Sequence, residues 1–242
     1  PVKQPEKQPE KSGTIPKGGK TAPSHKHSWS NWETKSEATV FAAELQTRSC
    51  SECKETEEKS VGKALAPTMK TNAANDKISI KKGSSTSLFY IGELAAGDSI
   101  KSVTSSSNKV VKVTAVKSKP GYYKLKAGKL TGKKGKAVIT ITLASGLTKK
   151  ISVTVVKGKV KTSSVKAEET SISLKKGKTM NLKAMITVEP FTSSDKLTFT
   201  SSSKKIVTVS KKGVLKAKKA GKAKITVKAG KKKLTIKVTV TK

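Results

Sequence analysis

Apolar and polar residues alternate along most of the chain from about residue 77. In the run KLTIKVTV at residues 233–240 every second residue is Leu, Ile or Val, and the residues between them are Lys or Thr. The same period of two recurs at residues 78–80, 139–143, 151–155 and 223–227. This alternation turns one side of a strand toward a core and the other toward water.

Glycines separate these runs, and we interpret them as turns: Gly83, Gly135, Gly146, Gly177, Gly213, Gly221 and Gly230. Many short strands at such spacing predict a β-sandwich or a barrel. Lysines on the outward positions also discourage strands of different molecules from pairing edge to edge.

The pattern occurs twice. ISIKKG at residues 78–83 matches ISLKKG at residues 172–177, and Leu88 then aligns with Leu182. TSSSNKVVKV, which begins at Thr104, matches TSSSKKIVTV, which begins at Thr200. GKAVI, which begins at Gly135, matches GKAKI, which begins at Gly221. A repeat of this length predicts two copies of one domain.

The second copy resembles the bacterial Ig-like group 2 family. The matching segments are the turn at Lys176 and Gly177, FTSSS at 199–203, IVTV at 206–209, KGVL at 212–215, AGKAKITV at 220–227 and VTV at 238–240. Phe199 stands where the family usually has Trp, and the first copy has Val103 there. The resemblance implies a small Ig-like sandwich that serves as a rigid stalk in bacterial surface proteins and adhesins, without catalytic residues.

We therefore predict an all-β chain with two tandem Ig-like β-sandwiches behind a small β-hairpin module and a disordered linker. The linker, rich in Pro and Lys, takes residues 1–23, and the module takes residues 24–67. The divergent first Ig-like domain takes residues 68–158 and the second takes residues 163–242. The polar connector between them leaves their relative orientation open.

Charge is distributed very unevenly along the chain. Residues 1–23 hold five Lys and two Glu, and residues 24–62 hold five basic and seven acidic residues. Residues 63–242 thus hold 42 basic and seven acidic residues, a net charge of +35 out of the chain's +36. Such a surface suits contact with anionic polymers, or it serves solubility alone.

Arg48 is the only arginine and aromatic residues are 4% of the chain, so we expect no specific nucleic-acid recognition.

The small module holds both histidines and both cysteines of the chain. His25 and His27 form an H-x-H pair, and Cys50 and Cys53 form a C-x-x-C pair. These four ligands suit a structural zinc ion. A Cys50–Cys53 disulfide is the alternative in an exported chain, and unmodified thiols are a third. In each case we expect a structural role, since about 40 residues cannot hold a core without a staple.

The module also resembles one found in secreted proteins of Gram-positive gut anaerobes, with an H-x-W-x-x-W start and an R-x-C-x-x-C hairpin. The matching residues are His27, Trp29, Trp32, Ala38, Thr39, Arg48, Cys50 and Cys53. In the relatives a Cys often stands two residues before the His, where this chain has His25, and this exchange of ligand types favours a metal. Trp29 and Trp32 are expected to form a miniature core, and the alternative is a platform on which sugars stack.

An insertion distinguishes the first copy from the second. The run KSKPGYYKLKAG at residues 117–128 replaces a tighter turn and brings Tyr122 and Tyr123 together. Paired tyrosines on a loop are a candidate contact site for a ligand, because Tyr combines rigid area with a hydroxyl. The alternative is that they cap the end of the sandwich. Residues 89–98 (FYIGELAAGD) are a further candidate loop.

The Ig-like region lacks the residues that most enzymes need. Both histidines precede residue 28, so no Ser-His-Asp triad fits within the sandwiches. Residues 63–242 hold only seven acids, which leaves little for paired-carboxylate catalysis or a calcium cage. No phosphate-binding glycine loop follows a strand. We expect no enzyme activity and no required cofactor apart from the candidate zinc.

We therefore expect a non-catalytic stalk or adhesive region of a secreted or surface protein in a Gram-positive envelope. Its partner would be an anionic cell-wall polymer or a host surface or extracellular protein, such as immunoglobulin or matrix. A third possibility is an accessory region of a larger enzyme that binds carbohydrate or wall polymer. No run approaches the roughly 18 consecutive apolar residues of a membrane span. We expect the protein to be a monomer. The chain begins Pro1-Val2-Lys3 without Met, so we expect a piece of a longer exported protein.

Overall fold

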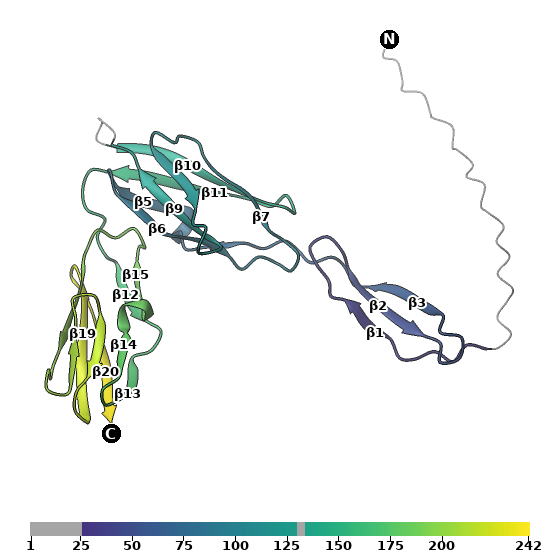
Figure 1. Cartoon of the computed structure of the whole chain (residues 1–242). Helices are drawn as coiled ribbons and strands as arrows, with labels where there is room; N and C mark the ends of the chain where they lie inside the picture. The colour runs from purple at the N-terminus through teal and green to yellow at the C-terminus, as the bar shows by residue number, and fades with distance from the viewer. Residues whose placement is uncertain (1–25, 130–133) are drawn as a thin grey trace, which may run out of the picture. The chain divides into compact units, whose positions relative to one another are not determined.

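A computed structural model describes residues 26–129 and 134–242 (Figure 1). Regular structure in these residues is strand apart from two short 3-10 helices, η1 (Ala74–Asp76) and η2 (Leu182–Met185). The prediction of an all-β chain is therefore confirmed. The linker predicted at residues 1–23 and the candidate ligand His25 lie outside the described residues.

The chain divides into two compact units. The first comprises Pro1–Glu37 and Glu44–Gly62, and the second comprises Ala38–Ala43 and Lys63–Lys242. The first unit contains an antiparallel sheet in the order β1 (Glu33–Ser36), β2 (Glu44–Ser49) and β3 (Thr56–Val61). The module thus has one strand more than the hairpin that its sequence predicts.

The first Ig-like domain is built from two four-stranded sheets. One has the order β5 (Lys77–Lys81), β11 (Thr148–Val156), β10 (Lys134–Leu143) and β7 (Ile100–Ser105). The other has the order β4 (Lys70–Thr71), β6 (Ser85–Gly92), β9 (Tyr122–Ala127) and β8 (Val111–Ala115).

The second Ig-like domain repeats the first of these sheets. Its four-stranded sheet has the order β13 (Ser171–Lys175), β20 (Lys232–Thr241), β19 (Gly221–Ala229) and β16 (Leu197–Ser201). Facing strands form two smaller sheets, β12 (Ser164–Ala167) with β15 (Ile186–Glu189), and β14 (Thr179–Asn181) with β18 (Val214–Ala217) and β17 (Val207–Val209).

Strand pairing supports the repeat seen in the sequence. In each domain the early strand runs parallel to the last one, with Ile78 opposite Val153 in the first and Ile172 opposite Val238 in the second. In each domain the last two strands form a long antiparallel hairpin, β10–β11 or β19–β20. The two copies therefore share one topology over this sheet.

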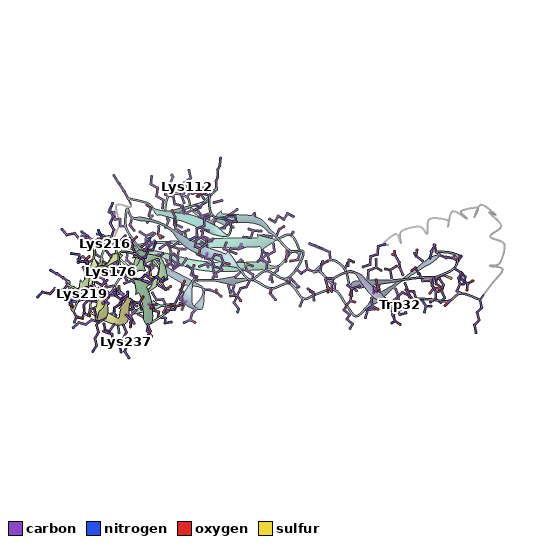
Figure 2. The ribbon with its side chains drawn as sticks, turned by 60° about the horizontal axis from the view of Figure 1, so that its bottom comes forward. Trp32, Lys112, Lys176, Lys216, Lys219 and Lys237 are labelled. Carbon is purple, nitrogen blue, oxygen red and sulfur yellow. The ribbon has the colours of Figure 1, made fainter. Side chains whose placement is uncertain are left out.

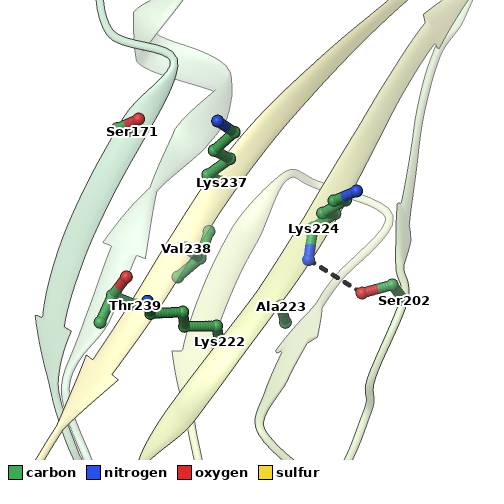
Figure 3. Close-up of a pocket in the computed structure, with 8 residues that line it drawn as sticks. All are labelled: Ser171, Ser202, Lys222, Ala223, Lys224, Lys237, Val238 and Thr239. Atoms are coloured by element: carbon green, nitrogen blue, oxygen red, sulfur yellow. Dashed lines mark hydrogen bonds between the residues drawn. The ribbon is translucent and has the colours of Figure 1, made fainter.

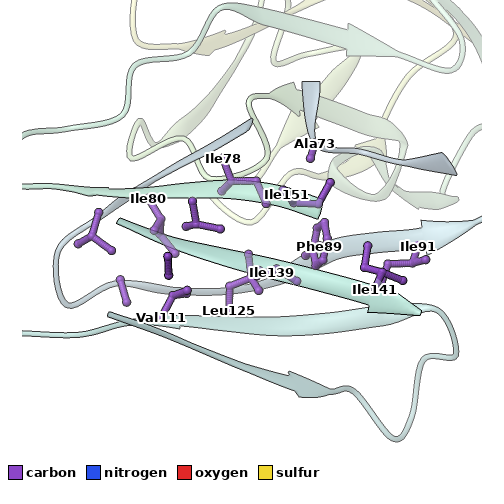
Figure 4. Close-up of a cluster of buried hydrophobic side chains, with 14 of the residues drawn as sticks. Ala73, Ile78, Ile80, Phe89, Ile91, Val111, Leu125, Ile139, Ile141 and Ile151 are labelled. Carbon is purple, nitrogen blue, oxygen red and sulfur yellow. The ribbon is translucent and has the colours of Figure 1, made fainter. Parts of the chain in front are cut away.

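The apolar positions of the alternating runs form the two cores. In the first domain Phe89, Leu125, Ile139 and Ile141 are fully buried (Figure 4). A corresponding cluster in the second domain includes Leu215, Ile225, Ile236 and Val238. Each fully buried side chain of this size contributes about 1.5–3 kcal/mol relative to exposure, so these rows dominate the stability of the sandwiches.

The alignment of Leu88 with Leu182 does not extend to their environments. Leu182 is fully buried, whereas Leu88 is 51% exposed and its neighbour Phe89 enters the core. The pairing of β6 with β9 shifts register between Thr86 and Phe89. An extra residue in one strand reverses the face on which the next side chain lies. The first copy therefore buries Phe89 in its core, where the alignment with Leu182 predicted Leu88.

Two of the glycines that we interpreted as turns lie in strands. Gly135 is inside β10 and Gly221 is the first residue of β19. Gly83, Gly146 and Gly177 have positive φ values of 71°, 90° and 84°, as tight turns require. The sequence runs that begin at Gly135 and Gly221 therefore mark the start of corresponding strands in the two copies.

The connector between the domains is held by hydrogen bonds to the segment that follows β15. The backbone N–H of Thr162 donates to Asp195 Oδ2 at 2.8 Å, and the N–H of Ser194 donates to the carbonyl oxygen of Val160 at 2.8 Å. The hydrogen bond from the Thr162 N–H is the main cause that holds the pKa of Asp195 below its ordinary value. Val160 and Thr162 are both buried, so the connector is an ordered part of the second unit.

The segment that follows β15 also contacts the first Ig-like domain, which belongs to the same compact unit. The hydroxyl of Thr192 donates to the carbonyl oxygen of Ser79 at 2.6 Å. The ring of Phe191 stacks on Phe89 with centroids 6.1 Å apart and packs against the first core.

Gly213 and Gly177 form a matched pair for testing a close contact in the second domain. Both have positive φ, 81° and 84°, but a Cβ at Gly213 would lie 2.9 Å from Phe199 Cζ and 2.8 Å from Lys183 Cβ. A Cβ at Gly177 would meet nothing within 4 Å. We expect Gly177→Ala to cost about 1 kcal/mol for the backbone alone, and Gly213→Ala to cost about 2–4 kcal/mol.

Differential scanning calorimetry would measure both costs as shifts in the melting of the second domain. Residues 163–242 contain neither Trp nor Tyr, so fluorescence would not report on this transition. Equal shifts for the two variants would contradict the tight packing of Gly213 against Phe199.

Candidate functional site

The connection between β2 and β3 forms a tight turn around the two cysteines. The backbone N–H of Cys50 donates to the carbonyl oxygen of Glu55 at 2.8 Å, and the N–H of Lys54 donates back to the carbonyl oxygen of Cys50 at 3.1 Å. Lys54 has φ of 63°, which reverses the chain after the second cysteine. Cys50 is consequently buried while Cys53 is exposed.

The segment that carries His27 runs beside this turn. Trp29 forms an antiparallel bridge with Cys50, and the backbone N–H of Ser51 donates to the carbonyl oxygen of Ser28 at 3.0 Å. This pairing brings His27 to the cysteines across 23 residues of sequence. One ligand atom from each of His27, Cys50 and Cys53 lies within 4.8 Å of the others. The fold therefore assembles three of the four candidate ligands, and the part played by His25 stays a prediction.

The two ring nitrogens of His27 have different surroundings. Nδ1 lies 3.4 Å from Cys53 Sγ, and Nε2 lies 3.4 Å from Glu55 Oε2. The ring itself stacks on Trp29, with centroids 4.8 Å apart. One edge of the imidazole therefore faces the sulfurs and the other faces a carboxylate.

Trp29 and Trp32 are half-buried, and the guanidinium of Arg48 makes a cation–π contact with both rings. The guanidinium carbon of Arg48 lies 4.8 Å from the centroid of Trp29 and 4.6 Å from that of Trp32. Its Nη2 atom also pairs with Glu57 Oε2 at 2.7 Å. Lys59 Nζ lies 4.2 Å from the Trp32 ring (Figure 2 labels Trp32). Cations thus occupy ring surface that a stacking sugar would need, which favours the miniature core over the sugar platform.

Tyr122 and Tyr123 do not form one platform. Because they are consecutive residues of β9, they point to opposite faces of the strand. Tyr123 packs against the first core near Phe89, with ring centroids 6.5 Å apart, and burial raises the pKa of its phenol. Tyr122 instead pairs across the strands with Tyr90 at 4.9 Å, under Lys119 Nζ at 3.8 Å.

The outer aromatic pair is therefore Tyr90 with Tyr122. Sequence reasoning missed this partner because cross-strand neighbours can be identified only when the register of β6 and β9 is known. Residues 117–128 also contain the whole of β9, so the segment interpreted as a loop is largely strand.

The exposed side of the sheet β13-β20-β19-β16 carries a group of lysines that we call the lysine face: Lys222, Lys224, Lys228, Lys233 and Lys237. Lys224 lies directly opposite Lys237 on the neighbouring strand, and Lys228 lies opposite Lys233. The remaining exposed side chains of these strands on this side are Ser, Thr and Lys175, and none is acidic.

A hollow of about 550 Å³ opens in this part of the domain (Figure 3). Lys222, Lys224 and Lys237 line it together with Ser202, whose Oγ accepts a hydrogen bond from the backbone N–H of Lys224 at 2.8 Å. A smaller hollow of about 390 Å³ occupies the corresponding place in the first domain, where Val138 and Ser152 replace Lys224 and Lys237.

Residues 159–240 match the family model of the bacterial Ig-like domain (group 2). This match confirms the resemblance of the second copy to this family and supports a non-catalytic, extracellular structural module in this part of the chain. A search of the curated proteins gave no match for the chain.

Several solved structures resemble parts of the chain. A bacterial Ig-like domain-containing GH10 xylanase from termite gut is 30% identical over 29% of this chain and 18% of that chain, with a TM-score of 0.26. Domains 4–9 of the surface layer protein SbsC are 19% identical over 82% of this chain and 35% of that chain, with a TM-score of 0.41. Protocadherin gamma B7 extracellular cadherin domains 1–4 are 12% identical over 81% of this chain and 56% of that chain, with a TM-score of 0.31.

Within residues 26–129 and 134–242, no helix has the length and apolar character needed to span a membrane.

The different surroundings of the adjacent tyrosines predict different effects on stability. We expect Tyr123→Ala to lower the free energy of unfolding of the first domain by about 1–3 kcal/mol, because the ring packs on the core. Tyr122→Ala removes an outer ring and is expected to cost less than about 1 kcal/mol. Calorimetry of the two variants would measure the difference. Equal losses would mean that both rings serve the core and that the Tyr90–Tyr122 pair is not an independent surface feature.

Proposed function

We propose that this chain, which ends in a bacterial Ig-like domain, is a stalk and adhesive segment of a Gram-positive envelope protein. The lysine face of the second domain is the surface that adheres, and its partner is an anionic polymer of the cell wall. The observation that carries this proposal is the placement of lysines directly opposite lysines in the hairpin β19–β20.

Like charges directly opposite one another on neighbouring strands destabilise a sheet. The second domain has two such pairs on one side of a single hairpin. Anionic groups bound over the face would relieve this repulsion, so the arrangement favours binding while it costs stability in the unbound domain. A need for solubility alone would be met by lysines that are spread apart.

The first domain supports the same interpretation by contrast. At the places of Lys224 and Lys237 it has Val138 opposite Ser152, and at the places of Lys228 and Lys233 it has Thr142 opposite Thr148. The shared topology therefore does not require lysines at these positions. Their concentration in one copy is a property of that copy's surface.

The chemistry of the face suits a polymer with repeated phosphates. Ammonium groups attract the charge, and the hydroxyls of Thr226, Thr235 and Thr239 can donate hydrogen bonds to phosphate oxygens between them. No carboxylate on the face competes for the ammonium groups.

A face-swap variant tests this proposal while preserving the fold. Lys224→Val, Lys237→Ser, Lys228→Thr and Lys233→Thr together give the second domain the residues that the first domain has at these positions. We expect weaker binding to poly(glycerol phosphate), measured by calorimetry or biolayer interferometry. Each phosphate contact contributes about 0.7–0.9 to the slope of log affinity against log salt, so the slope should fall by about three.

A matched control removes four lysines elsewhere in the same domain. Lys176, Lys178, Lys216 and Lys219 are exposed, and they lie between β13 and β14, on β18 or between β18 and β19 (Figure 2 labels Lys176, Lys216 and Lys219). Changing them to Thr gives the same net charge. The proposal requires that the control variant bind more tightly than the face-swap variant. Equal weakening would assign the effect to net charge alone.

Two other results would favour the other candidate functions. Saturable binding to immunoglobulin or a matrix protein that persists at high salt would indicate specific capture of a host protein. Binding to uncharged wall polysaccharide that is insensitive to the four lysines would indicate an accessory carbohydrate-binding region.

A further inference from the structure

The first unit has almost no apolar core. Every residue of β1 and β3 is exposed, and five of the six residues of β2 are only half-buried. Among the described residues of this unit, Cys50 is the one hydrophobic residue that is buried, at 0% exposure. Three short strands without a core are marginal in water, so this unit requires another source of stability.

The one buried hydrophobic side chain, that of Cys50, lies beside the ligand atoms of His27 and Cys53. We propose that His27, Cys50 and Cys53 hold one zinc ion through Nδ1 and the two Sγ atoms, and that this ion is the structural staple of the module. Thiolate and imidazole are the ligands that tetrahedral zinc prefers. On binding, each thiol loses its proton to solvent, and the sulfur lone pair forms the bond to the metal.

The surroundings of His27 fit a ligand rather than a simple surface histidine. With Nδ1 bound to the metal, Nε2 would carry the hydrogen, and Glu55 Oε2 lies 3.4 Å away, where it can accept that hydrogen. Histidines that bind zinc usually make such a hydrogen bond to a carboxylate, which fixes the tautomer and the ring orientation. Stacking on Trp29 further holds the ring in place.

The turn that carries the cysteines is also prepared for a metal. The reciprocal hydrogen bonds of Cys50 with Glu55 and Lys54, together with the positive φ of Lys54, hold both sulfurs on the side of His27. Two sulfurs and one nitrogen leave the fourth position of the tetrahedron open to a water molecule.

Zinc would stabilise this unit more effectively than a Cys50–Cys53 disulfide. A disulfide between residues three apart closes only the turn, and a cross-link stabilises less as the loop it closes becomes shorter. A metal bound by His27 as well closes the much longer loop from residue 27 to residue 50 and ties the entering segment to the hairpin. Only the second arrangement gives a role to the closeness of His27 to both sulfurs.

Native mass spectrometry of the full 242-residue chain provides the first test. We expect one zinc ion per chain, removed by a chelator. Hydrogen–deuterium exchange should show that residues 26–62 then lose protection, while β10 and β19 keep theirs. A mass lower by two hydrogens with no metal would establish the disulfide and overturn the proposal.

Cobalt(II) titration of the chelator-treated, reduced chain tests the ligands directly, without a requirement that any variant fold. Visible bands of tetrahedral cobalt with thiolate charge-transfer absorption are expected, and their absence would overturn the proposal. Cys50→Ser and Cys53→Ser should abolish these bands, and retention of the full cobalt spectrum by either variant would contradict the ligand assignment.

Two further variants separate a metal site from mere folding of the turn. Glu55→Gln keeps all three ligands but weakens the acceptor of the Nε2 hydrogen, and we expect about 10–100-fold weaker zinc affinity at unchanged stoichiometry. Ser51→Ala lies in the same turn, where the backbone of Ser51 makes the contact to Ser28, and it should bind zinc as the unaltered chain does. Equal affinity for the two variants would exclude the assigned role of Glu55.

Discussion

The register of the long hairpins β10–β11 and β19–β20 determines most of this structure. In β19–β20, Ile225 lies opposite Ile236 toward the core, and Lys224 lies opposite Lys237 toward water. A slip of one residue in either strand would exchange the two sets and force lysine ammonium groups into the core. Burying an unpaired charge costs far more than a hairpin gains, so the outward lysines exclude the wrong registers. The same residues that form the lysine face therefore also help to specify the fold.

This coupling explains why the sandwiches were predictable from the sequence. Alternation defines which side chains face inward, and the repeat shows which strands correspond, so residues 139–143 and 233–240 could be assigned to strands before the structure was known. Departures occur where strand pairing is irregular. The register shift before Phe89 exchanged the roles of Leu88 and its neighbour, and nothing in the local sequence distinguishes this strand from a regular one.

The candidate sites were less predictable than the strands, because they depend on which segments lie side by side. The sequence shows that His27, Cys50 and Cys53 have suitable chemistry, but only the bridge between Trp29 and Cys50 brings them together. Arg48 lies over two Trp rings, a contact that depends on the pairing within the module. The lysine face also depends on pairing, since only the register of β19 with β20 reveals that its lysines stand opposite one another.

The two units illustrate different solutions to the cost of ordering a chain. Each sandwich buries rows of Ile, Val and Leu, and this burial provides a margin within which paired lysines can be tolerated on the outer surface. The small module has no such rows, because β1 and β3 are exposed throughout and no residue of β2 is more than half-buried. Its order must come from a few strong, directional contacts, and the convergence of His27, Cys50 and Cys53 is where the structure concentrates them. A domain with a large core can therefore lose any one surface contact and remain folded, whereas with the proposed zinc staple this module would depend on the cluster of His27, Cys50 and Cys53.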